Sequence, residues 1–455
     1  MKKGEILEGD VCRVDYPNRG IVKIGEEKII VKNTLPGQKV RFVIQKKRSG
    51  HAEGRLLEVI APSPVETRAP ACSIYPACGG CMYLTMPYSE QLKMKEEQLV
   101  RLLAPFMGEG VWEGIIPSPG EFGYRNKMEF SFGDAEKNGP LTLGLHKRQS
   151  TYDILDAVDC ALVHEDMTVI LKKVLSYCRE NHFTYYHKNS HIGYLRHLLL
   201  RRGTHTGELL ICLVTSGQED HDLQPLVKEL LSLDDLKGKI AGILHIINDS
   251  LADLVQSDET RILYGTDSFE EELLGLRFQI RPFSFFQPNS GAAEKLYQKV
   301  REYVGTIDKN SIIYDLYSGT GTITQLLSPA AKEVIGVEIV EEAVLAAREN
   351  AKMNGLTNCR FLAGDVLKVL DSLTELPDTL ILDPPRDGLH PKVLPKILSY
   401  GVKKTVYVSC KATSLIRDLP AFYAQGYVIE RACAVDQFCQ TPHVETVVLM
   451  SKVKE

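Results

Sequence analysis

The sequence predicts a multidomain protein with an N-terminal β-barrel, a central α+β region and a C-terminal doubly wound α/β domain. From about residue 311, strand-like apolar runs alternate regularly with helical stretches, as in open, mostly parallel sheets. Residues 1–60 instead hold short alternating apolar and polar runs between turn signals, which is typical of a barrel of about five strands. We place the domains at 1–60, 61–280 and 281–455.

Length and composition agree with several soluble domains. The 455 residues exceed one domain of roughly 150 residues, and 44% hydrophobic with 25% charged residues is close to the globular average. No apolar run approaches the roughly 20 residues that span a bilayer, and the N-terminus lacks the apolar core of a secretory signal. We therefore expect a cytoplasmic protein without a membrane partner, and no pattern predicts an obligate protein partner.

Charge is distributed unevenly along the chain. The net charge is −5, but residues 1–60 contain 13 Lys and Arg against 8 Asp and Glu, a net of +5, which leaves −10 for the remainder. A basic appendage on an acidic body suits a nucleic-acid partner, although an ordinary solvated surface also explains such a run.

The central region begins after a proline-containing linker at 61–64 and a cysteine-bearing loop at 72–81. A helical pattern follows from Ser89, which we expect to be the N-cap, to about Leu103. Between 120 and 280 the strand-like runs KMEFSF, HLLLRR, ELLICLV and GILHII indicate a mixed α+β fold. Ligands of the C-terminal domain are expected at the carboxyl ends of its parallel strands, where the strand order reverses.

A glycine-rich loop follows the first strand of the C-terminal domain. Gly319 and Gly321 allow backbone amides to approach a ligand, although such turns also serve plain strand-helix packing. Glu338 stands nineteen residues after Gly319, at the end of the second strand, where a carboxylate can bind both hydroxyls of a ribose. A dinucleotide site would have a third glycine where Thr324 stands, so S-adenosylmethionine fits better than NAD.

Two further strand ends carry carboxylates. Asp365 follows the third strand, in position to contact an adenine edge, and Asp383 follows the fourth in the rigid turn Asp383-Pro384-Pro385-Arg386. Such a turn suits a cationic or amine-bearing ligand above the sheet. An aromatic residue after the two prolines is typical of amine methylation, and Arg386 at that position argues against it.

Cys410 ends the fifth strand, at the ligand-binding edge, and Glu445 begins the last strand. Inert packing is the alternative for the cysteine, and an ordinary solvent-facing residue is the alternative for the glutamate. We expect Lys411 to favour the thiolate form of Cys410. A thiolate that adds to carbon 6 of a uracil makes carbon 5 nucleophilic towards a methyl donor, and a base must then remove the carbon-5 proton. Cys410 and Glu445 suit these two roles.

Taken together, the motifs resemble the RNA (uracil-5-)-methyltransferase family, in its iron-sulfur-containing 23S rRNA branch with a TRAM domain and a class I methyltransferase domain. The resemblance runs nearly end to end and is carried by five motifs: RPFSFFQPN at 281–289, DLYSGTG at 315–321, LDPPRDGL at 382–389, VYVSC at 406–410 and TPHVETVVL at 441–449.

This resemblance implies that Cys410 is the nucleophile and Glu445 the base, and that Phe285 stacks on the target base, where a core phenylalanine is the alternative. Many members follow the nucleophile with Asn-Pro, whereas this chain has Lys411-Ala412. The implied cofactor contacts are Gln287, Tyr317, Glu338 and Asp383.

Four cysteines, Cys72, Cys78, Cys81 and Cys160, match a further feature of the branch. One close pair with two separated thiols suits a [4Fe-4S] cluster better than a zinc site, and four unrelated buried thiols are the alternative. The resemblance implies the cluster at these positions. We expect a structural or RNA-positioning role, because methyl transfer needs no redox step.

The same resemblance identifies residues 1–60 as a TRAM domain, an OB-like barrel, with Lys46, Lys47, Arg48 and Arg55 as candidate phosphate contacts. The substrate is expected to be a single-stranded or flipped uridine in 23S ribosomal RNA. A tRNA uracil-5 methyltransferase is the nearest alternative, expected to lack the cysteines and the barrel. A non-catalytic RNA-binding assembly factor or an iron-sulfur sensor is the alternative from a different class.

Overall fold

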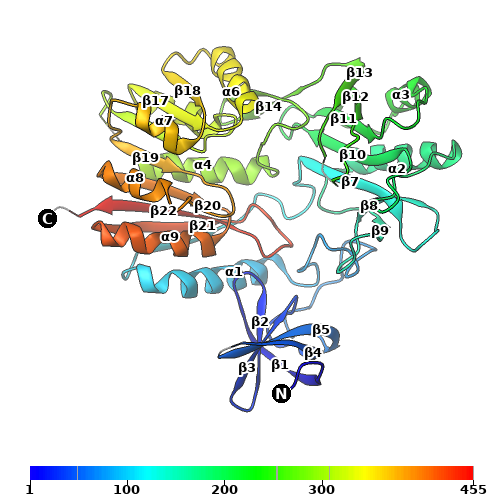
Figure 1. Ribbon diagram of the computed structural model, residues 1–455, viewed down its shortest axis with the longest axis horizontal. Helices are drawn as coiled ribbons and strands as arrows, with labels where there is room; N and C mark the ends of the chain where they lie inside the picture. The colour runs from blue at the N-terminus through cyan, green and yellow to red at the C-terminus, as the bar shows by residue number, and fades with distance from the viewer. Residues whose placement is uncertain (49, 253–254, 307, 454–455) are drawn as a thin grey trace.

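The structure, a computed structural model, describes residues 1–48, 50–252, 255–306 and 308–453. Within these ranges the strands form a closed barrel, a seven-stranded sheet, a two-stranded hairpin and an eight-stranded sheet. Figure 1 shows the barrel below two larger bodies, with the eight-stranded sheet on the left and the seven-stranded sheet on the right. The predicted multidomain architecture with an N-terminal barrel is therefore confirmed. No helix of the described ranges has the length and apolar character to cross a membrane.

The N-terminal barrel closes in the order β1-β2-β3-β5-β4, which leaves no free strand edge. Alternating residues of each strand point inward, so Val22, Val31 and Phe42 are completely buried in its core. Gly54 lets Phe42 enter this core, because a Cβ at Gly54 would lie 2.8 Å from the Phe42 ring. The strands are β1 (Ile6–Asp15), β2 (Arg19–Ile24), β3 (Glu27–Lys32), β4 (Lys39–Arg48) and β5 (His51–Ala61).

The seven-stranded sheet has the order β13-β12-β11-β10-β7-β8-β9 and is buried on both faces. Leu198 and Leu200 pack with helices α2 (Glu165–Glu180) and α3 (Gln224–Leu231), whereas Leu199 packs on the opposite face with the β14–β15 hairpin and α4. The strands and remaining elements are β7 (Lys127–Asp134), β8 (Leu141–His146), β9 (Ile154–Asp156), β10 (Leu195–Arg202), β11 (Glu208–Thr215), β12 (Lys239–Ile247), β13 (Glu259–Gly265), β14 (Phe269–Leu273), β15 (Leu276–Ile280) and α4 (Ser290–Val304).

The eight-stranded sheet has the order β18-β17-β16-β19-β20-β22-β21-β6. Strands β16 to β20 are parallel, and β22 enters antiparallel between β20 and β21. The order reverses between β16 and β19, as predicted for a doubly wound sheet. Its elements are β16 (Ile312–Leu316), α5 (Thr322–Leu327), β17 (Glu333–Glu338), α6 (Glu341–Met353), β18 (Cys359–Ala363), α7 (Val366–Ser372), β19 (Thr379–Leu382), α8 (Val393–Ser399), β20 (Lys404–Ser409), α9 (Ala412–Ala424), β21 (Tyr427–Val435) and β22 (Glu445–Lys452).

Two elements that precede the seven-stranded sheet in the chain lie with the C-terminal sheet in space. Strand β6 (Trp112–Ile116) pairs in parallel with β21, and Leu103, at the end of helix α1 (Tyr88–Leu103), is buried in the core of that domain. The helix expected from Ser89 is present, but its N-cap is Pro87 and makes no side-chain cap, so the cap expected at Ser89 is wrong.

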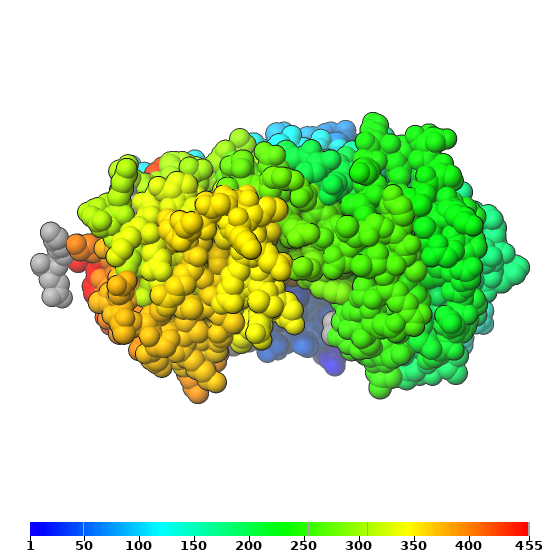
Figure 2. Space-filling model, turned by 90° about the horizontal axis from the view of Figure 1, so that it is seen from above, coloured from blue at the N-terminus to red at the C-terminus, as the bar shows by residue number. Residues whose placement is uncertain are grey.

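The two larger bodies leave a hollow between them. Figure 2 shows this hollow between the yellow lobe of the C-terminal domain and the green lobe of the seven-stranded sheet, with blue atoms of the barrel visible in it. In Figure 1 the arrow of β22 points away from the seven-stranded sheet, so the parallel strands, which run the opposite way, end towards that sheet. The ligand-binding edge of the C-terminal sheet therefore faces the middle of the molecule.

Candidate active site

Strand register brings the two candidate reacting groups to one edge. Ser409 of β20 pairs with Thr446 of the antiparallel strand β22, so Cys410 follows the end of β20 where Glu445 begins β22. Asp383 follows β19, the parallel neighbour of β20 on its other side. Three side chains that are far apart in the sequence therefore meet at the carboxyl edge of the sheet.

The Cys410 thiol is half-buried among carboxyl groups. Burial, followed by the charges of Glu445 and Asp383, raises its pKa to about 11, and Arg386 opposes this shift. Lys411 is exposed and is not among the main causes of the shift, and the pKa of Cys410 is raised, so the expectation that Lys411 favours the thiolate is wrong. The neighbouring carboxyl groups and the loss of water outweigh one solvated ammonium group.

The carboxyl groups themselves hold protons at unusually high pH. Burial and the charge of Asp383 raise the pKa of Glu445, which is 2% exposed, to about 8. Burial and Asp315 raise the pKa of Asp383 to about 7, and burial raises that of Asp315 to about 6. Thr324 donates a hydrogen bond of 2.6 Å to one oxygen of Asp315, whose other oxygen is buried without a partner in the part of the chain that the structure describes. Clustered buried carboxyl groups suit a cationic ligand, which would favour their charged forms.

Tyr297 of helix α4 lies beside this carboxyl cluster, and sequence reasoning missed it. Its side chain is 6% exposed, and burial together with Asp383, Glu445 and Asp315 raises the pKa of its hydroxyl well above the usual range. The tyrosine is one of several apolar residues at helical spacing in α4, so no sequence signal separated it from ordinary core residues.

The glycine-rich loop holds a strained backbone at the end of β16. Tyr317 has φ +69°, which is unusual for a residue with a side chain, and Gly319 and Gly321 also have positive φ. A Cβ at Gly321 would lie 2.4 Å from Phe361, so this glycine serves packing. A Cβ at Gly319 would meet nothing nearer than 3.9 Å, so space remains at this position for a ligand.

Glu338 and Asp365 occupy the expected strand ends but already make backbone contacts. Glu338 accepts hydrogen bonds from the amides of Gly319 at 3.0 Å and Val340 at 2.9 Å, which fixes the carboxylate beside the glycine-rich loop. Asp365 is exposed and caps helix α7 by accepting from the amide of Leu367 at 2.9 Å. Each carboxylate keeps lone pairs for a ligand.

A buried arginine, also missed from the sequence, shapes the segment 281–289. Arg201 is 1% exposed, and one terminal nitrogen donates to the carbonyls of Arg281, Pro282 and Ser284. Burial lowers the pKa of Arg201 to about 10. In the sequence, Arg201 is distinguished only by its position at the end of the apolar run HLLL. The three carbonyl groups that it contacts belong to a distant loop, so the sequence of the strand could not predict them.

The turn held by Arg201 presents Phe285 to solvent. Phe285 is 66% exposed, whereas its neighbour Phe286 is 6% exposed and belongs to the core. Thr320 of the glycine-rich loop donates to the carbonyl of Phe285 at 3.3 Å, which joins the two loops. Gln287 is 7% exposed, and Asn126 donates to its carbonyl at 2.8 Å.

The four cysteines of the predicted cluster loop lie near one another. Burial, followed by the charges of Cys160, Cys78 and Cys72, raises the pKa of Cys81 to about 12. Arg148 donates to the carbonyls of Cys78 and Cys81, which holds the loop closed. Among the described residues, no group of three or more His, Cys, Asp or Glu side chains is arranged to hold a metal ion.

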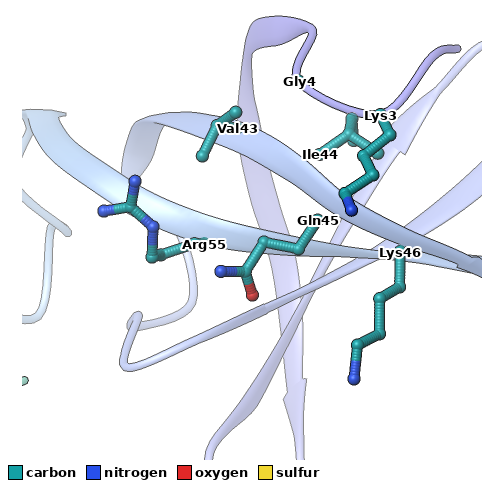
Figure 3. Close-up of a pocket in the computed structure, with 7 residues that line it drawn as sticks. All are labelled: Lys3, Gly4, Val43, Ile44, Gln45, Lys46 and Arg55. Atoms are coloured by element: carbon teal, nitrogen blue, oxygen red, sulfur yellow. The ribbon is translucent and has the colours of Figure 1, made fainter.

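The candidate phosphate contacts lie on the outer surface of the barrel. Figure 3 shows Lys3, Gln45, Lys46 and Arg55 lining one open pocket there. The other two predicted contacts form exposed ion pairs of 3.4 Å, Lys47 with Glu27 and Arg48 with Glu53.

Comparisons with known proteins agree with this geometry. Residues 87–453 match the family model described as tRNA (Uracil-5-)-methyltransferase. An uncharacterized RNA methyltransferase of Clostridium tetani is 44% identical over 98% of each chain, and one of Caldanaerobacter subterraneus is 42% identical over 99% of this chain and 100% of its own.

A solved structure is similar over nearly the whole chain. The tRNA (uracil-54, C5)-methyltransferase of Pyrococcus abyssi, in complex with S-adenosyl-L-homocysteine, matches with a TM-score of 0.75 and 26% identity, covering 98% of this chain and 100% of its own. The predicted resemblance is confirmed at the level of the family. The chain belongs to the tRNA (uracil-5-)-methyltransferase family and is an S-adenosylmethionine-dependent RNA methyltransferase.

Proposed function

We propose that the chain methylates carbon 5 of a uridine in 23S rRNA through a covalent adduct between Cys410 and carbon 6. The observation that carries this proposal is the meeting of Cys410 and Glu445 at one edge of the sheet, the same edge at which the glycine-rich loop follows β16. Neither an adenosine-binding loop nor a lone thiol would need a buried carboxyl group at that place.

The reaction follows from the chemistry of these two groups. After the thiol proton passes to water, the Cys410 sulfur forms a bond to carbon 6, which breaks the double bond of the ring and moves its electron pair to carbon 5 and the carbonyl. Carbon 5 then forms a bond to the methyl group that S-adenosylmethionine would supply as an electrophile; the bond from that methyl group to the sulfonium sulfur would break, and S-adenosylhomocysteine would be the leaving group. Glu445 then removes the carbon-5 proton, the bond from sulfur to carbon 6 breaks, and the ring double bond returns.

Cofactor contacts from Gln287, Tyr317, Glu338, Asp365 and Asp383 complete the proposed site. The residues fit a sulfonium cofactor because burial raises the pKa of Asp383, and because the Ser318 hydroxyl and one Asp315 oxygen are buried without partners among the described residues. The ribose would take the lone pairs that remain on Glu338, and the sulfonium charge would lie near Asp383.

The cysteine loop is proposed to hold a [4Fe-4S] cluster on Cys72, Cys78, Cys81 and Cys160. Four soft sulfur donors with no carboxylate ligand suit iron-sulfur or zinc chemistry. Thiolates around one zinc ion lie about 3.8 Å apart, as Zn–S bonds of about 2.3 Å in a tetrahedron require. The charges of Cys160, Cys78 and Cys72 all act on the Cys81 thiol, so the four thiols share one neighbourhood, and the family resemblance favours four irons over one zinc ion.

The choice of 23S rRNA rests on the family resemblance of the whole motif set. A tRNA substrate is the second candidate, favoured by the Pyrococcus abyssi structure, which is a tRNA (uracil-54, C5)-methyltransferase. That structure covers 98% of this chain, so the N-terminal barrel does not separate the two candidates, contrary to our expectation.

Tritium release tests the function and the substrate together. Unmodified 23S rRNA and tRNA, each carrying uridine tritiated at carbon 5, are incubated with the protein and S-adenosylmethionine. We expect release from 23S rRNA that requires the methyl donor and produces 5-methyluridine. Tritium release from tRNA alone would show that tRNA, and not 23S rRNA, is the substrate. No release from either RNA would contradict the proposed function.

A further inference from the structure

The turn between β1 and β2 leaves the barrel and enters the C-terminal domain. Before it, Arg101 of helix α1 donates to Asp15 at 3.1 Å, and after it, Asn18 donates to the sulfur of Met82 at 3.3 Å. These contacts hold the turn against α1 and the cysteine loop. Tyr16 lies between the two anchors.

Tyr16 is buried beside both candidate reacting groups. Its side chain is 6% exposed and belongs to one apolar cluster with Leu99, Ala412, Ala434 and Val444. Ala412 comes two residues after Cys410, and Val444 immediately precedes Glu445. One side chain of the barrel therefore packs with the residues that flank the nucleophile and the base.

The Tyr16 hydroxyl faces the first amide of helix α9. Burial raises the pKa of Tyr16 to about 12, the amide of Ala412 lowers it, and the charges of Glu445 and Cys410 raise it. Ala412 is the first residue of α9, where a backbone N–H has no acceptor within the helix. The Tyr16 oxygen interacts with this amide, and the ring lies in one apolar cluster with Ala412 and Val444.

We propose that Tyr16 is a positioning residue that fixes the turn after Cys410 and so joins the barrel to the reaction centre. The inference rests on the proposed role of Cys410 as nucleophile. Its consequence is that an element outside the methyltransferase domain sets the rate of the chemical step, in addition to any RNA contact that the barrel makes.

Steady-state kinetics of Tyr16→Phe with the full chain test this role. The phenylalanine keeps the ring in the apolar cluster but removes the oxygen that interacts with the Ala412 amide, so the turn loses one of its contacts. We expect kcat to fall about tenfold or more, with the KM for RNA and the Kd for S-adenosylmethionine unchanged. An unchanged kcat, or a rise in KM alone, would overturn the proposal.

A second variant removes the other partner of the same contact. Ala412→Pro deletes the amide at a position where helices accept proline. If both residues act through one contact, the double variant Tyr16→Phe with Ala412→Pro is no slower than Tyr16→Phe alone. Fully additive losses would contradict a shared contact.

Two controls separate the possible failures. Ile29→Val lies in the barrel core away from the cluster, and we expect it to lower the melting temperature slightly without changing kcat. Cys410→Ala tests the proposed function itself. Activity in Cys410→Ala would overturn the covalent mechanism, whereas an inactive Cys410→Ala beside a fully active Tyr16→Phe would overturn only the role of Tyr16.

Discussion

The protein contains two buried thiol sites whose neighbours differ in kind. Burial raises the pKa of Cys410 to about 11 and that of Cys81 to about 12. Cys410 lies among the carboxyl groups of Glu445 and Asp383, whereas the charges nearest to Cys81 are other thiols. The neighbouring groups therefore decide what each thiol can do. Carboxyl groups that can accept a proton suit a transient covalent bond to Cys410, whereas the soft sulfur donors around Cys81 suit a permanent set of metal ligands.

The two thiol sites are physically joined. The amides of Met82 and Tyr83, which follow Cys81, both donate to the carbonyl of Gln440, five residues before Glu445. Gln440 is completely buried with φ +66°, and its side chain accepts a hydrogen bond of 2.9 Å from Gln91 of helix α1. The cysteine loop therefore supports the segment that leads to the proposed base.

The largest effect on activity is expected from replacing Cys410, the thiol that lies among carboxyl groups. Cys410→Ala removes the nucleophile, so carbon 5 is never activated, and methylation should fall below detection. Binding of S-adenosylmethionine, measured by calorimetry, should remain nearly intact because Cys410 is not a cofactor contact. Loss of cofactor binding in this variant would indicate a structural role for the thiol.

Replacing a thiol of the cysteine loop should remove the absorption of the proposed cluster and affect the rate of methyl transfer less than Cys410→Ala does. Anaerobically purified protein is expected to be brown with about four irons per chain, and Cys78→Ala or Cys81→Ala should bleach it. Cys178→Ala is the control, because this thiol is completely buried but lies in the core of α2 and the seven-stranded sheet, away from the four cysteines. A colourless wild-type protein with one zinc per chain would contradict the cluster assignment.

The barrel surface should give a smaller, salt-dependent effect. Lys46→Ala removes one proposed phosphate contact, so RNA affinity should fall several-fold and the slope of log affinity against log salt should decrease by about 1. Lys228→Ala, on helix α3 of the central region, is the control that should leave both quantities unchanged. Equal behaviour of the two variants would remove Lys46 from the RNA contacts.

The smallest effect concerns stability and pH. The pKa of Glu445 is raised from the ordinary 4.5 to about 8 in the folded chain, so folding favours its protonated form. The resulting stability is fully present below about pH 4.5 and is lost as the pH rises towards 8. Glu445→Gln stays neutral at every pH. Its unfolding free energy relative to wild type should therefore rise between pH 5 and 8, by up to a few kcal/mol, and its melting temperature relative to wild type should rise with it. A constant difference would contradict the raised pKa.

Local patterns predicted the parts of the site that lie at strand ends. The run DLYSGTG and the spacing to Glu338 are set by one β-α-β unit, so the sequence alone located the glycine-rich loop. Contacts between distant segments were not predictable in this way. Arg201 binds carbonyls eighty residues away, and β6 joins β21 across more than three hundred residues. The effect of Lys411 was also misjudged, because its solvation and the surrounding carboxyl groups are three-dimensional properties.

The central claim, that Cys410 adds before methyl transfer and Glu445 acts after it, is tested most directly by trapping the adduct in Glu445→Gln. This variant keeps the shape of the side chain but cannot take the carbon-5 proton, so the reaction should stop at the methylated covalent complex. Denaturing electrophoresis should show a slow band that requires the methyl donor. Mass spectrometry of the RNA-linked peptide should show Cys410 bonded to a uracil that carries the methyl group on carbon 5. Normal turnover by Glu445→Gln, or an adduct without the methyl group, would contradict the account.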